Sequence, residues 1–439
     1  MKQWRLKSKE ERRFKQGHPW VYSNELQESP KGIKAGEMLQ LNDAGGAFLA
    51  YGFGNPGSLI AFRAISREKQ EFIDEASLLN KIINESLMSA FKFRKQWFSL
   101  QQSFRLVFGE NDDLPGLVID RYFGQYPVYV VQPHSAGMDA NLPMITEVLS
   151  KISKDLGESS ESKVIYRRDA GSREREGLSK EPTEVRFLHT GKIIENLDPY
   201  RSFSFQLQSL MAREVTLTVD LISGQKTGFF FDQAQNVKLV QTLLLRKLRY
   251  QGKQSKKFEL LDLCSYVGQW SVQLSQVFLE KKIPVMITAV DASDTALKFA
   301  EMNVKKNSID SGSGEVQFNR LKADVLEPMG GLQDKNFEVV VADPPAFIKS
   351  RKTIPQGKHA YVQLFTTAIQ KTAVNGLVVC CSCSQLLSAE EMKEVLQKAS
   401  RRSGRKVRWL AQGSPSVDHF TKAEFEEGHY LKCWVGSVE

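Results

Sequence analysis

Apolar and turn-forming residues alternate at short intervals near the start of the chain. Residues 36–66 read GEMLQLNDAGGAFLAYGFGNPGSLIAFRAIS, where apolar runs of a few residues are separated by glycine, asparagine and aspartate. Short strands bounded by such turn residues are typical of small β-barrels. We therefore predict a β-rich, barrel-like module over residues 1–72.

Helical and strand patterns are mixed in the next part of the chain. Residues 73–97 and 141–156 predict helices, and residues 104–132 predict strands joined by a turn. Together they predict a central α/β domain over residues 73–195. Within it, the stretch 167–184 is charged and rich in residues that break helices, and we expect it to be mobile.

Strands and helices alternate regularly from about residue 258 onward. This repeated order predicts a parallel, doubly wound, Rossmann-like sheet, which we assign to a third domain over residues 196–439. Two late apolar runs, 406–412 and 429–438, have no clear helix between them, so we expect them to pair antiparallel. Ligands of such α/β sheets bind beyond the carboxyl ends of the strands.

The charge pattern suggests a partner. Lys and Arg number 60 against 51 Asp and Glu, and the basic residues gather in residues 2–15, 246–257 and 401–408. Clusters of this kind are typical of surfaces that bind polyanions, nucleic acid first.

The chain shows no sign of a membrane or secretory destination. It has no run of about 18 apolar residues, and its first 20 residues lack the apolar core of a secretory signal. Its five cysteines have no regular spacing, so we expect free thiols and a cytoplasmic location.

Aspartates lie at or just after the ends of several predicted strands. They are Asp262, Asp291, Asp324 and Asp343. An acidic residue at the end of the second strand suits the two ribose hydroxyls of an adenosine cofactor. The loop after the first strand, DLCSYVGQWS, has one glycine, which argues against a dinucleotide and is compatible with S-adenosylmethionine.

The sequence ADPPAF (342–347) is the most specific local signal. Two prolines end the strand, because proline has no N–H to donate, and they hold the preceding residue extended. Such a loop would present Asp343 to a planar base. A plain turn at the end of the strand is the alternative interpretation.

Three of the five cysteines are crowded into VVCCSCSQ (378–385). Cys380 and Cys381 continue an apolar strand and are predicted to pack in the core, whereas Cys383 lies at the end of that strand. No second Cys/His pair accompanies them, so we predict no metal site. The pattern by itself leaves Cys383 open as either a structural thiol or a nucleophile.

Taken together, these motifs resemble one family across nearly the whole chain. The sequence resembles the bacterial large-subunit ribosomal-RNA cytosine carbon-5 methyltransferases, which consist of a PUA domain, a central α/β domain and a Rossmann-like S-adenosylmethionine domain. The strings that carry the resemblance are GHPWVYSNEL (17–26), GENDDLPGLVIDRY (109–122), SGQKTGFFFDQ (223–233), LDLCSYVGQWSV (261–272), VDASDTAL (290–297), DPPAF (343–347), CSCS (381–384) and EGHYLK (427–432).

The resemblance implies roles for individual residues. The cofactor is S-adenosylmethionine, and its site would contain Asp262, Ser265, Tyr266 and Gly268 beside the methionine part, Asp291 at the ribose, Asp324 near the adenine, and Asp232 and Gln233 in the wall. The target base would meet Asp343, with Pro344, Pro345 and Phe347 positioning it. Cys383 would be the nucleophile. RNA, ribosomal RNA first, is the implied partner, and a homodimer is allowed.

The chain also departs from the family pattern. Residues 264–269 replace the usual glycine-richer loop, Ala346 stands where relatives often have lysine, and Gln385 stands where they often have glycine. Two other functions therefore stay open. One is methylation of a guanine or adenine amine without a nucleophile, and the other is RNA binding by a chain whose methyltransferase domain is inactive.

Overall fold

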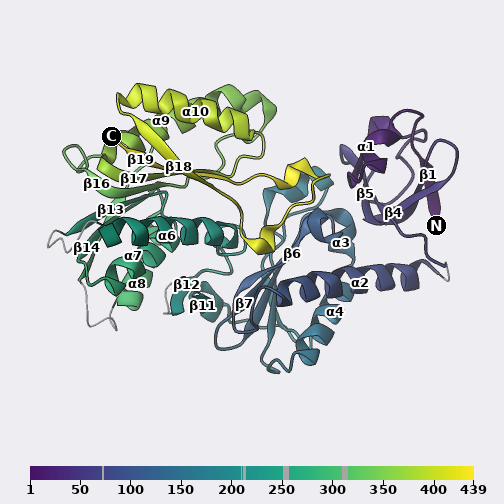
Figure 1. Cartoon of the computed structure of the whole chain (residues 1–439). Coiled ribbons are helices and arrows are strands. Elements are labelled where there is room, and N and C mark those ends of the chain that lie inside the picture. Colours follow the sequence, from purple (N-terminus) through teal and green to yellow (C-terminus); the bar gives the residue numbers. More distant parts are fainter. Residues whose placement is uncertain (72–73, 209, 211–213, 251–256, 309–314) are drawn as a thin grey trace. The chain divides into compact units, whose positions relative to one another are not determined.

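The fold is described from a computed structural model of the 439-residue chain (Figure 1). The description covers all residues except 72–73, 209, 211–213, 251–256 and 309–314, so half of the basic stretch 246–257 lies outside it. The chain divides into two compact units. Unit 1 consists of Met1–Phe205, Asp220–Phe229 and Asp418–Gly428, and unit 2 consists of Gln206–Val219, Phe230–Val417 and His429–Glu439.

Unit 1 begins with a five-stranded sheet in the order β1-β3-β4-β5-β2. Its elements are β1 (Lys2–Arg5), α1 (Glu11–Lys15), β2 (Trp20–Tyr22), β3 (Glu37–Asn42), β4 (Phe48–Gly54) and β5 (Ile60–Ser66). Trp4, Leu39 and Phe62 lie in its core, where burial of large apolar side chains holds so small a sheet together. The β-rich module predicted from the alternating pattern is confirmed.

The rest of unit 1 is built on a second sheet in the order β10-β9-β8-β7-β6. Its elements are α2 (Glu75–Lys95), β6 (Phe104–Phe108), β7 (Leu117–Phe123), β8 (Pro127–Pro133), α3 (Ala136–Ala140), α4 (Leu142–Asp155), β9 (Lys163–Tyr166), β10 (Glu184–Phe187) and α5 (Asp198–Arg201). Helices α2 and α4 pack on each other, and their apolar faces share one core with the strands. Buried ion pairs, such as Arg105–Asp120 at 2.8 Å, hold the strands in register.

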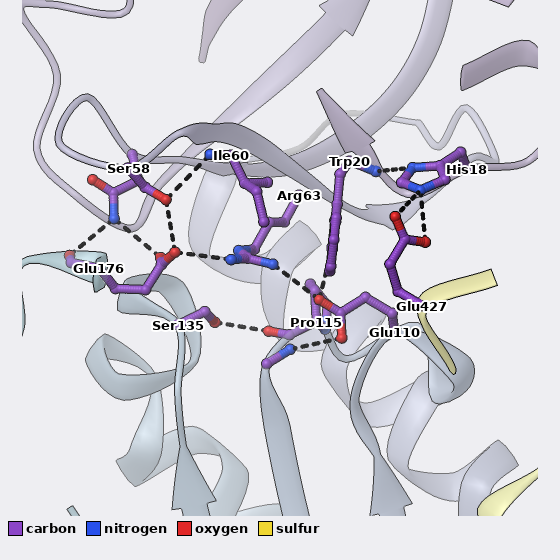
Figure 2. Close-up of polar contacts among 12 residues, drawn as sticks. His18, Trp20, Ser58, Ile60, Arg63, Glu110, Pro115, Ser135, Glu176 and Glu427 are labelled. Atoms are coloured by element: carbon purple, nitrogen blue, oxygen red, sulfur yellow. Dashed lines mark hydrogen bonds and ion pairs between the residues drawn. The ribbon is translucent and has the colours of Figure 1, made fainter. Parts of the chain in front are cut away.

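Glu110 joins the two sheets of unit 1 (Figure 2). Its Oε1 accepts hydrogen bonds from the indole N–H of Trp20 at 2.8 Å and from Arg63 at 3.0 Å. Arg63 also pairs with Glu176 at 2.8 Å, and all these side chains are largely shielded from water. A shielded charge must keep its partners, so this network ties the N-terminal sheet to the central part.

The stretch 167–184 differs from its prediction. It contains a 3₁₀ helix, η3 (Gly171–Glu176), in which Arg173 and Glu176 are buried. Arg173 pairs with Asp139 at 2.7 Å. Residues that the sequence indicates to be in a mobile loop are thus held by ion pairs, which local sequence patterns do not reveal.

Unit 2 contains a seven-stranded sheet in the order β15-β14-β13-β16-β17-β19-β18. The strands are β13 (Phe258–Leu263), β14 (Val285–Asp291), β15 (Val316–Lys322), β16 (Phe337–Ala342), β17 (Thr372–Ser382), β18 (Val407–Gly413) and β19 (Lys432–Val438). The first five are parallel to one another, and β19 runs antiparallel between β17 and β18. The predicted Rossmann-like sheet with an antiparallel late pair is confirmed.

Helices cover both faces of this sheet (Figure 1). They are α6 (Ala234–Tyr250), α7 (Gln269–Glu280) and α8 (Asp294–Ser308), which pack side by side, and α9 (Ile354–Lys371) and α10 (Ala389–Ser403), which pack on each other. A two-stranded sheet of β11 (Phe203–Gln208) and β12 (Glu214–Val219) precedes them in the chain. The strand order reverses between β13 and β16, and a crevice at such a switch point is where α/β sheets bind ligands.

Candidate functional site

The four aspartates predicted to meet at the carboxyl edge of the sheet do so. Asp262 lies beside Ala289 of β14 and Val341 of β16, so Asp291 and Asp343 follow at the ends of its two neighbours. Asp324 follows β15, whose last residue pairs with Asp291. All four carboxylates raise the pKa of the Cys264 thiol, although burial of that thiol is the larger cause. Cys264 is therefore a poor candidate for a thiolate.

Asp262 is fully buried at the switch point. Its Oδ2 accepts hydrogen bonds from the Ser271 hydroxyl at 2.6 Å and the Ser271 N–H at 3.1 Å. Burial raises the pKa of Asp262 to about 7, against the lowering effect of Ser271. Within the part of the chain that is described, its Oδ1 and the Ser265 hydroxyl are buried without a hydrogen-bond partner. Two such polar atoms at a sheet edge fit a polar ligand, because leaving them unpaired is costly.

The loop between β13 and α7 has an unusual backbone. Cys264, Tyr266 and Gly268 have φ of 64°, 48° and 83°, in the left-handed region that non-glycine residues seldom adopt. The conformation is held by the Tyr266 N–H, which donates to Asp291 Oδ2 at 2.9 Å. A Cβ on Gly268 would lie 3.0 Å from Ala300, so this position requires glycine.

Asn303 on α8 supports the same loop from behind. Its Nδ2 donates to the carbonyl of Val267 at 2.9 Å and to that of Thr218 at 3.0 Å. It is fully buried. The sequence does not predict this role for Asn303, because an asparagine within a helical pattern gives no signal of a contact to a strand 85 positions away.

Asp291 and Asp324 differ in how exposed they are. Asp291 is half-buried, and its Oδ1 accepts from the Ser293 N–H at 2.9 Å. Each of its oxygens keeps a second lone pair for a ligand. Asp324 is exposed, and its Oδ1 accepts from the Leu326 N–H at 2.9 Å. Asp324 therefore lies at the rim of the edge that the other three aspartates form.

Asp343 is held by two side chains from other elements. Gln233, in the 3₁₀ helix η4 (Phe231–Gln233), donates to Oδ1 at 2.9 Å, and Trp270 of α7 donates its indole N–H to Oδ2 at 2.9 Å. Asn236 in turn donates to Gln233 Oε1 at 2.7 Å. Trp270 was not among the predicted site residues, although it lies two positions after the predicted Gly268. These bonds fix the direction in which the carboxylate of Asp343 points.

Asp232, beside Gln233, is bound by the C-terminal part of unit 2. The Tyr430 hydroxyl donates to its Oδ2 at 2.5 Å, and the Ser416 N–H donates to its carbonyl oxygen at 2.9 Å. Phe230, just before η4, packs edge-to-face on the ring of Tyr266 at 5.3 Å between centroids. Residues 232–233, predicted to form a wall, thus lie beside both the loop between β13 and α7 and Asp343.

The three clustered cysteines have different surroundings. Cys380 and Cys381 are completely buried in β17, and burial raises the pKa of both thiols. Cys383 follows the last residue of β17 and is half-buried. Its Sγ lies 3.8 Å from the carbonyl oxygen of Pro344. The strand-end cysteine and the Asp-Pro-Pro loop are therefore adjacent, as their places at neighbouring strand ends predict.

The Asp-Pro-Pro loop rests on a small polar cluster. The Ser384 hydroxyl lies 2.8 Å from the Tyr361 hydroxyl and accepts from the Ile348 N–H at 3.2 Å. The ring of Phe347 packs on that of Tyr361, with 4.8 Å between centroids. Pro345 is exposed at the tip of the loop. The loop is thus anchored through Phe347 and Ile348, while Pro345 at its tip is exposed.

Lys432 is a buried cation beside this loop that the sequence analysis did not single out. Its Nζ donates to the carbonyl of Ser384 at 2.9 Å and to that of Tyr430 at 3.0 Å. Burial lowers the pKa of Lys432 to about 8. The one indication of Lys432 in the sequence is that it ends EGHYLK (427–432), one of the motifs that resemble the family.

The described residues contain neither a candidate metal site nor a helix suited to crossing a membrane. They contain no group of three or more His, Cys, Asp or Glu residues placed to hold a metal ion. In the same part of the chain, no helix combines the length and apolar character needed to cross a bilayer.

Parts of the basic stretches make contacts within the chain. Arg405 donates to the carbonyls of Ile369 and Thr372, and Arg408 pairs with Glu439. Arg401 and Arg402 of the same stretch are exposed. Near the N-terminus, Lys9 and Arg12 are exposed as well, whereas Arg13 pairs with Glu25 at 3.2 Å. Part of the positive charge in these stretches is therefore engaged within the chain.

Known protein families match both ends of the molecule. Residues 5–67 match the PUA-like domain, and residues 231–406 match the methyltransferase small domain. The chain is a methyltransferase with an N-terminal PUA-like domain.

This methyltransferase is homologous to proteins named ribosomal RNA large subunit methyltransferase I. The protein of Klebsiella pneumoniae (strain 342) is 27% identical over 423 residues, covering 96% of this chain and 94% of the relative. That of Escherichia coli O127:H6 is 28% identical over 426 residues, covering 96% and 95%.

Two solved structures share the fold of this methyltransferase along their whole length. One is described as a SAM-dependent methyltransferase from Streptococcus mutans, with a TM-score of 0.70, 16% identity and full coverage of both chains. The other is described as a methyltransferase complexed with SAH, with a TM-score of 0.71, 16% identity and full coverage of both chains. The likeness confirms the α/β architecture and its Rossmann-like sheet, and the match of residues 5–67 confirms the PUA-like module.

Proposed function

We propose that this protein transfers a methyl group from S-adenosylmethionine to carbon-5 of a cytosine in RNA, and that Cys383 forms a covalent adduct with the base. The observation that carries the proposal is the position of Cys383. Its half-buried Sγ lies 3.8 Å from the carbonyl oxygen of Pro344, in the loop that carries the fixed carboxylate of Asp343. Large-subunit ribosomal RNA is the proposed substrate, because the relatives are named for it.

The carboxyl edge of the sheet suits S-adenosylmethionine, which supplies a methyl group on a positively charged sulfur. Asp262 and Ser265 have buried oxygens that need partners, and Tyr266 and Gly268 complete the loop around them. Asp291 would hold the ribose hydroxyls, and Asp324 at the rim would lie near the adenine. Clustered carboxylates also create the negative potential that a cationic sulfur requires.

The Asp-Pro-Pro loop would hold the target base. Asp343 is fixed by Gln233 and Trp270, so its carboxylate can bind the edge of cytosine that carries N3 without reorganising. Pro344, Pro345 and Phe347 would position the ring above the anchored part of the loop. Asp232 and Gln233 would form the wall between the base and the cofactor.

Cys383 would supply the electrons that carbon-5 lacks. Its thiolate forms a bond to carbon-6, which places an electron pair at carbon-5. Carbon-5 takes the methyl group, and the electron pair of the broken bond stays on the cofactor's sulfur. Loss of the carbon-5 proton to solvent then restores the ring double bond and expels the thiolate. Atoms and charge balance without a further reactant.

Exposed basic side chains of the N-terminal module and of α10 would contribute affinity for RNA. Lys9 and Arg12 are exposed on or beside α1, and Arg401 and Arg402 are exposed at the end of α10. Such side chains bind phosphates through charge and release counterions. A cytoplasmic location and a homodimer stay predictions of the sequence.

The decisive experiment combines a trap with an analysis of the product. RNA carrying 5-fluorocytosine at the target should trap the wild-type protein covalently, because fluorine cannot leave as a proton does. Mass spectrometry of RNA nucleosides after turnover should show 5-methylcytidine. Cys383→Ala should lose both results, and Cys381→Ala, the matched change of a buried neighbour, should keep both at a cost of about 1 kcal/mol in stability.

Other results would point to the two alternatives. Methylated guanosine or adenosine, formed equally well by Cys383→Ala, would support the amine methyltransferase and overturn the covalent mechanism. Calorimetry that detects RNA binding but no binding of S-adenosylmethionine would support the RNA-binding protein without catalysis.

A further inference from the structure

Strand pairing places Lys432 directly beside the end of the strand that carries the cysteines. Lys432 is the first residue of β19, and it pairs with Ser382, the last residue of β17. The next pair is Cys433 with Cys381. Lys432 is 7% exposed, so its ammonium group lies inside the protein rather than in solvent.

Two carbonyl oxygens hold the ammonium group of Lys432 in place. One belongs to Ser384, the residue after Cys383, at 2.9 Å, and the other to Tyr430 at 3.0 Å. Ser382 is the strand partner of Lys432, and the carbonyl of Ser384 accepts its hydrogen bond. Cys383 lies between these two serines in the chain. An ammonium group has three N–H donors, and these bonds occupy two.

The electrostatics link Lys432 to Cys383. Burial lowers the pKa of Lys432 to about 8, while negative charge on Cys383 and on Glu391 acts in the opposite direction. The attraction between two charges belongs to the pair, so an ammonium group stabilised by a thiolate stabilises that thiolate equally. Below pH 8 the lysine carries the charge that this requires.

We infer that Lys432 is a positioning residue that holds Cys383 in its thiolate form. The thiolate is the nucleophilic form of cysteine, and a nearby cation is one of the devices that produce it. The inference rests on the proposed function, which makes Cys383 the nucleophile. Beyond the proposed function, the inference identifies Lys432 as the positive charge that activates the Cys383 thiol.

Among the described residues, the nearby groups Tyr361, Glu391 and Cys381 do not supply this charge. Burial raises the pKa of Tyr361 to about 12, so the phenol beside Ser384 is neutral. Glu391 is negative and therefore cannot supply a positive charge. It pairs with Lys358 at 2.6 Å, so the charge of Lys358 is engaged by Glu391. The thiol of Cys381 is buried with a raised pKa and carries no charge at neutral pH.

The test measures the thiol rather than methyl transfer. Iodoacetamide alkylates thiolates, so the rate of alkylation against pH gives the midpoint of thiol ionisation. Tandem mass spectrometry of tryptic peptides distinguishes Cys383 from Cys380 and Cys381. The variants are Lys432→Met, which removes the charge, and Lys432→Arg, which keeps it. Lys371→Met is the control, because Lys371 also donates to two backbone carbonyls, those of Leu332 and Gln333.

Lys432→Met should raise the midpoint for Cys383 by one unit or more, which lowers the thiolate fraction and slows alkylation at pH values below the new midpoint by up to about tenfold. Lys432→Arg and Lys371→Met should keep the wild-type midpoint. A folded Lys432→Met protein with an unchanged midpoint overturns the inference. If Lys432→Met does not fold, a raised midpoint in folded Lys432→Arg overturns it instead, because the retained charge would then be without effect.

The outcome is separable from that of the proposed function. Should Cys383→Ala still methylate RNA while Lys432→Met raises the midpoint, the lysine tunes the thiol but the covalent mechanism fails. Should 5-fluorocytosine trap the protein while the midpoint is unchanged, the mechanism stands and the lysine has no part in it.

Discussion

The indole N–H of Trp270 donates a hydrogen bond of 2.9 Å to Oδ2 of Asp343. Trp270 lies on α7, directly after the loop proposed to hold the cofactor, and Asp343 lies in the loop proposed to hold the target base. One hydrogen bond therefore connects the two halves of the proposed site. Since Trp270 is 3% exposed, its ring cannot move without disturbing the core around it.

Trp270→Phe should reduce kcat/KM for RNA methylation by roughly tenfold or more and leave the Kd for S-adenosylmethionine near its wild-type value. Phenylalanine keeps the ring in the core but removes the N–H, and a hydrogen bond to a charged acceptor contributes about 1.5–3 kcal/mol. Steady-state kinetics and calorimetry measure the two quantities. Trp409→Phe on β18 is the matched control and should change neither. Equal loss of cofactor binding would show that the bond supports the fold alone.

Asp291→Ala should weaken binding of S-adenosylmethionine tenfold or more and spare RNA affinity. The half-buried carboxylate is proposed to accept both ribose hydroxyls, and it also fixes the Tyr266 N–H at 2.9 Å. Asp294→Ala, a change three positions further on of an aspartate whose side chain is 47% exposed, serves as the control in the same calorimetric titration. An unchanged Kd in Asp291→Ala would mean that the ribose is held elsewhere.

Asp262 should make the protein without cofactor less stable as pH rises from about 4 to about 7. Burial raises its pKa in the folded state to about 7, whereas an unfolded aspartate has a pKa near ~3.9. In this window the folded state keeps a proton that the unfolded state has released, so the free energy of unfolding falls with pH and is level above pH 7. The upper limit of the loss is roughly 4 kcal/mol.

Asp262→Asn should abolish this slope, because an amide does not titrate. The variant should be more stable than wild type at pH 8 and about equally stable at pH 4, as measured by denaturant unfolding at both pH values. Asp294→Asn changes an exposed carboxyl and should keep the wild-type slope. A wild-type protein equally stable at pH 5 and pH 7.5 would contradict a raised pKa for Asp262.

Lys9→Gln combined with Arg12→Gln should weaken RNA binding and reduce its salt dependence. Removing one ionic bond to phosphate should lower the slope of log K against log salt by about 0.7–0.9. Both side chains are exposed, so folding should be unaffected, whereas removal of the whole module would leave Glu110 without Trp20 and Arg63. Lys151→Gln on α4, also exposed, is the control. A slope equal to wild type in the double variant would exclude this surface from RNA binding.

The local pattern of the sequence determined much of this protein. Alternating strands and helices require a parallel sheet, and a parallel sheet gathers the ends of its strands at one edge, so Asp262, Asp291 and Asp343 had to meet. An apolar run had to place Cys380 and Cys381 in the core and Cys383 at the strand end. These conclusions follow from periodicity, which neighbouring residues encode among themselves.

Only the tertiary structure decided which side chains complete the site. Gln233 reaches Asp343 across 110 positions, and Lys432 reaches Ser384 across 48. Burial of Arg173 and Glu176 likewise depends on distant carboxylates and amides, so a charged stretch that reads as mobile is ordered. Contacts of this kind leave no periodic trace, because their energy comes from pairing polar groups that the whole fold has removed from water.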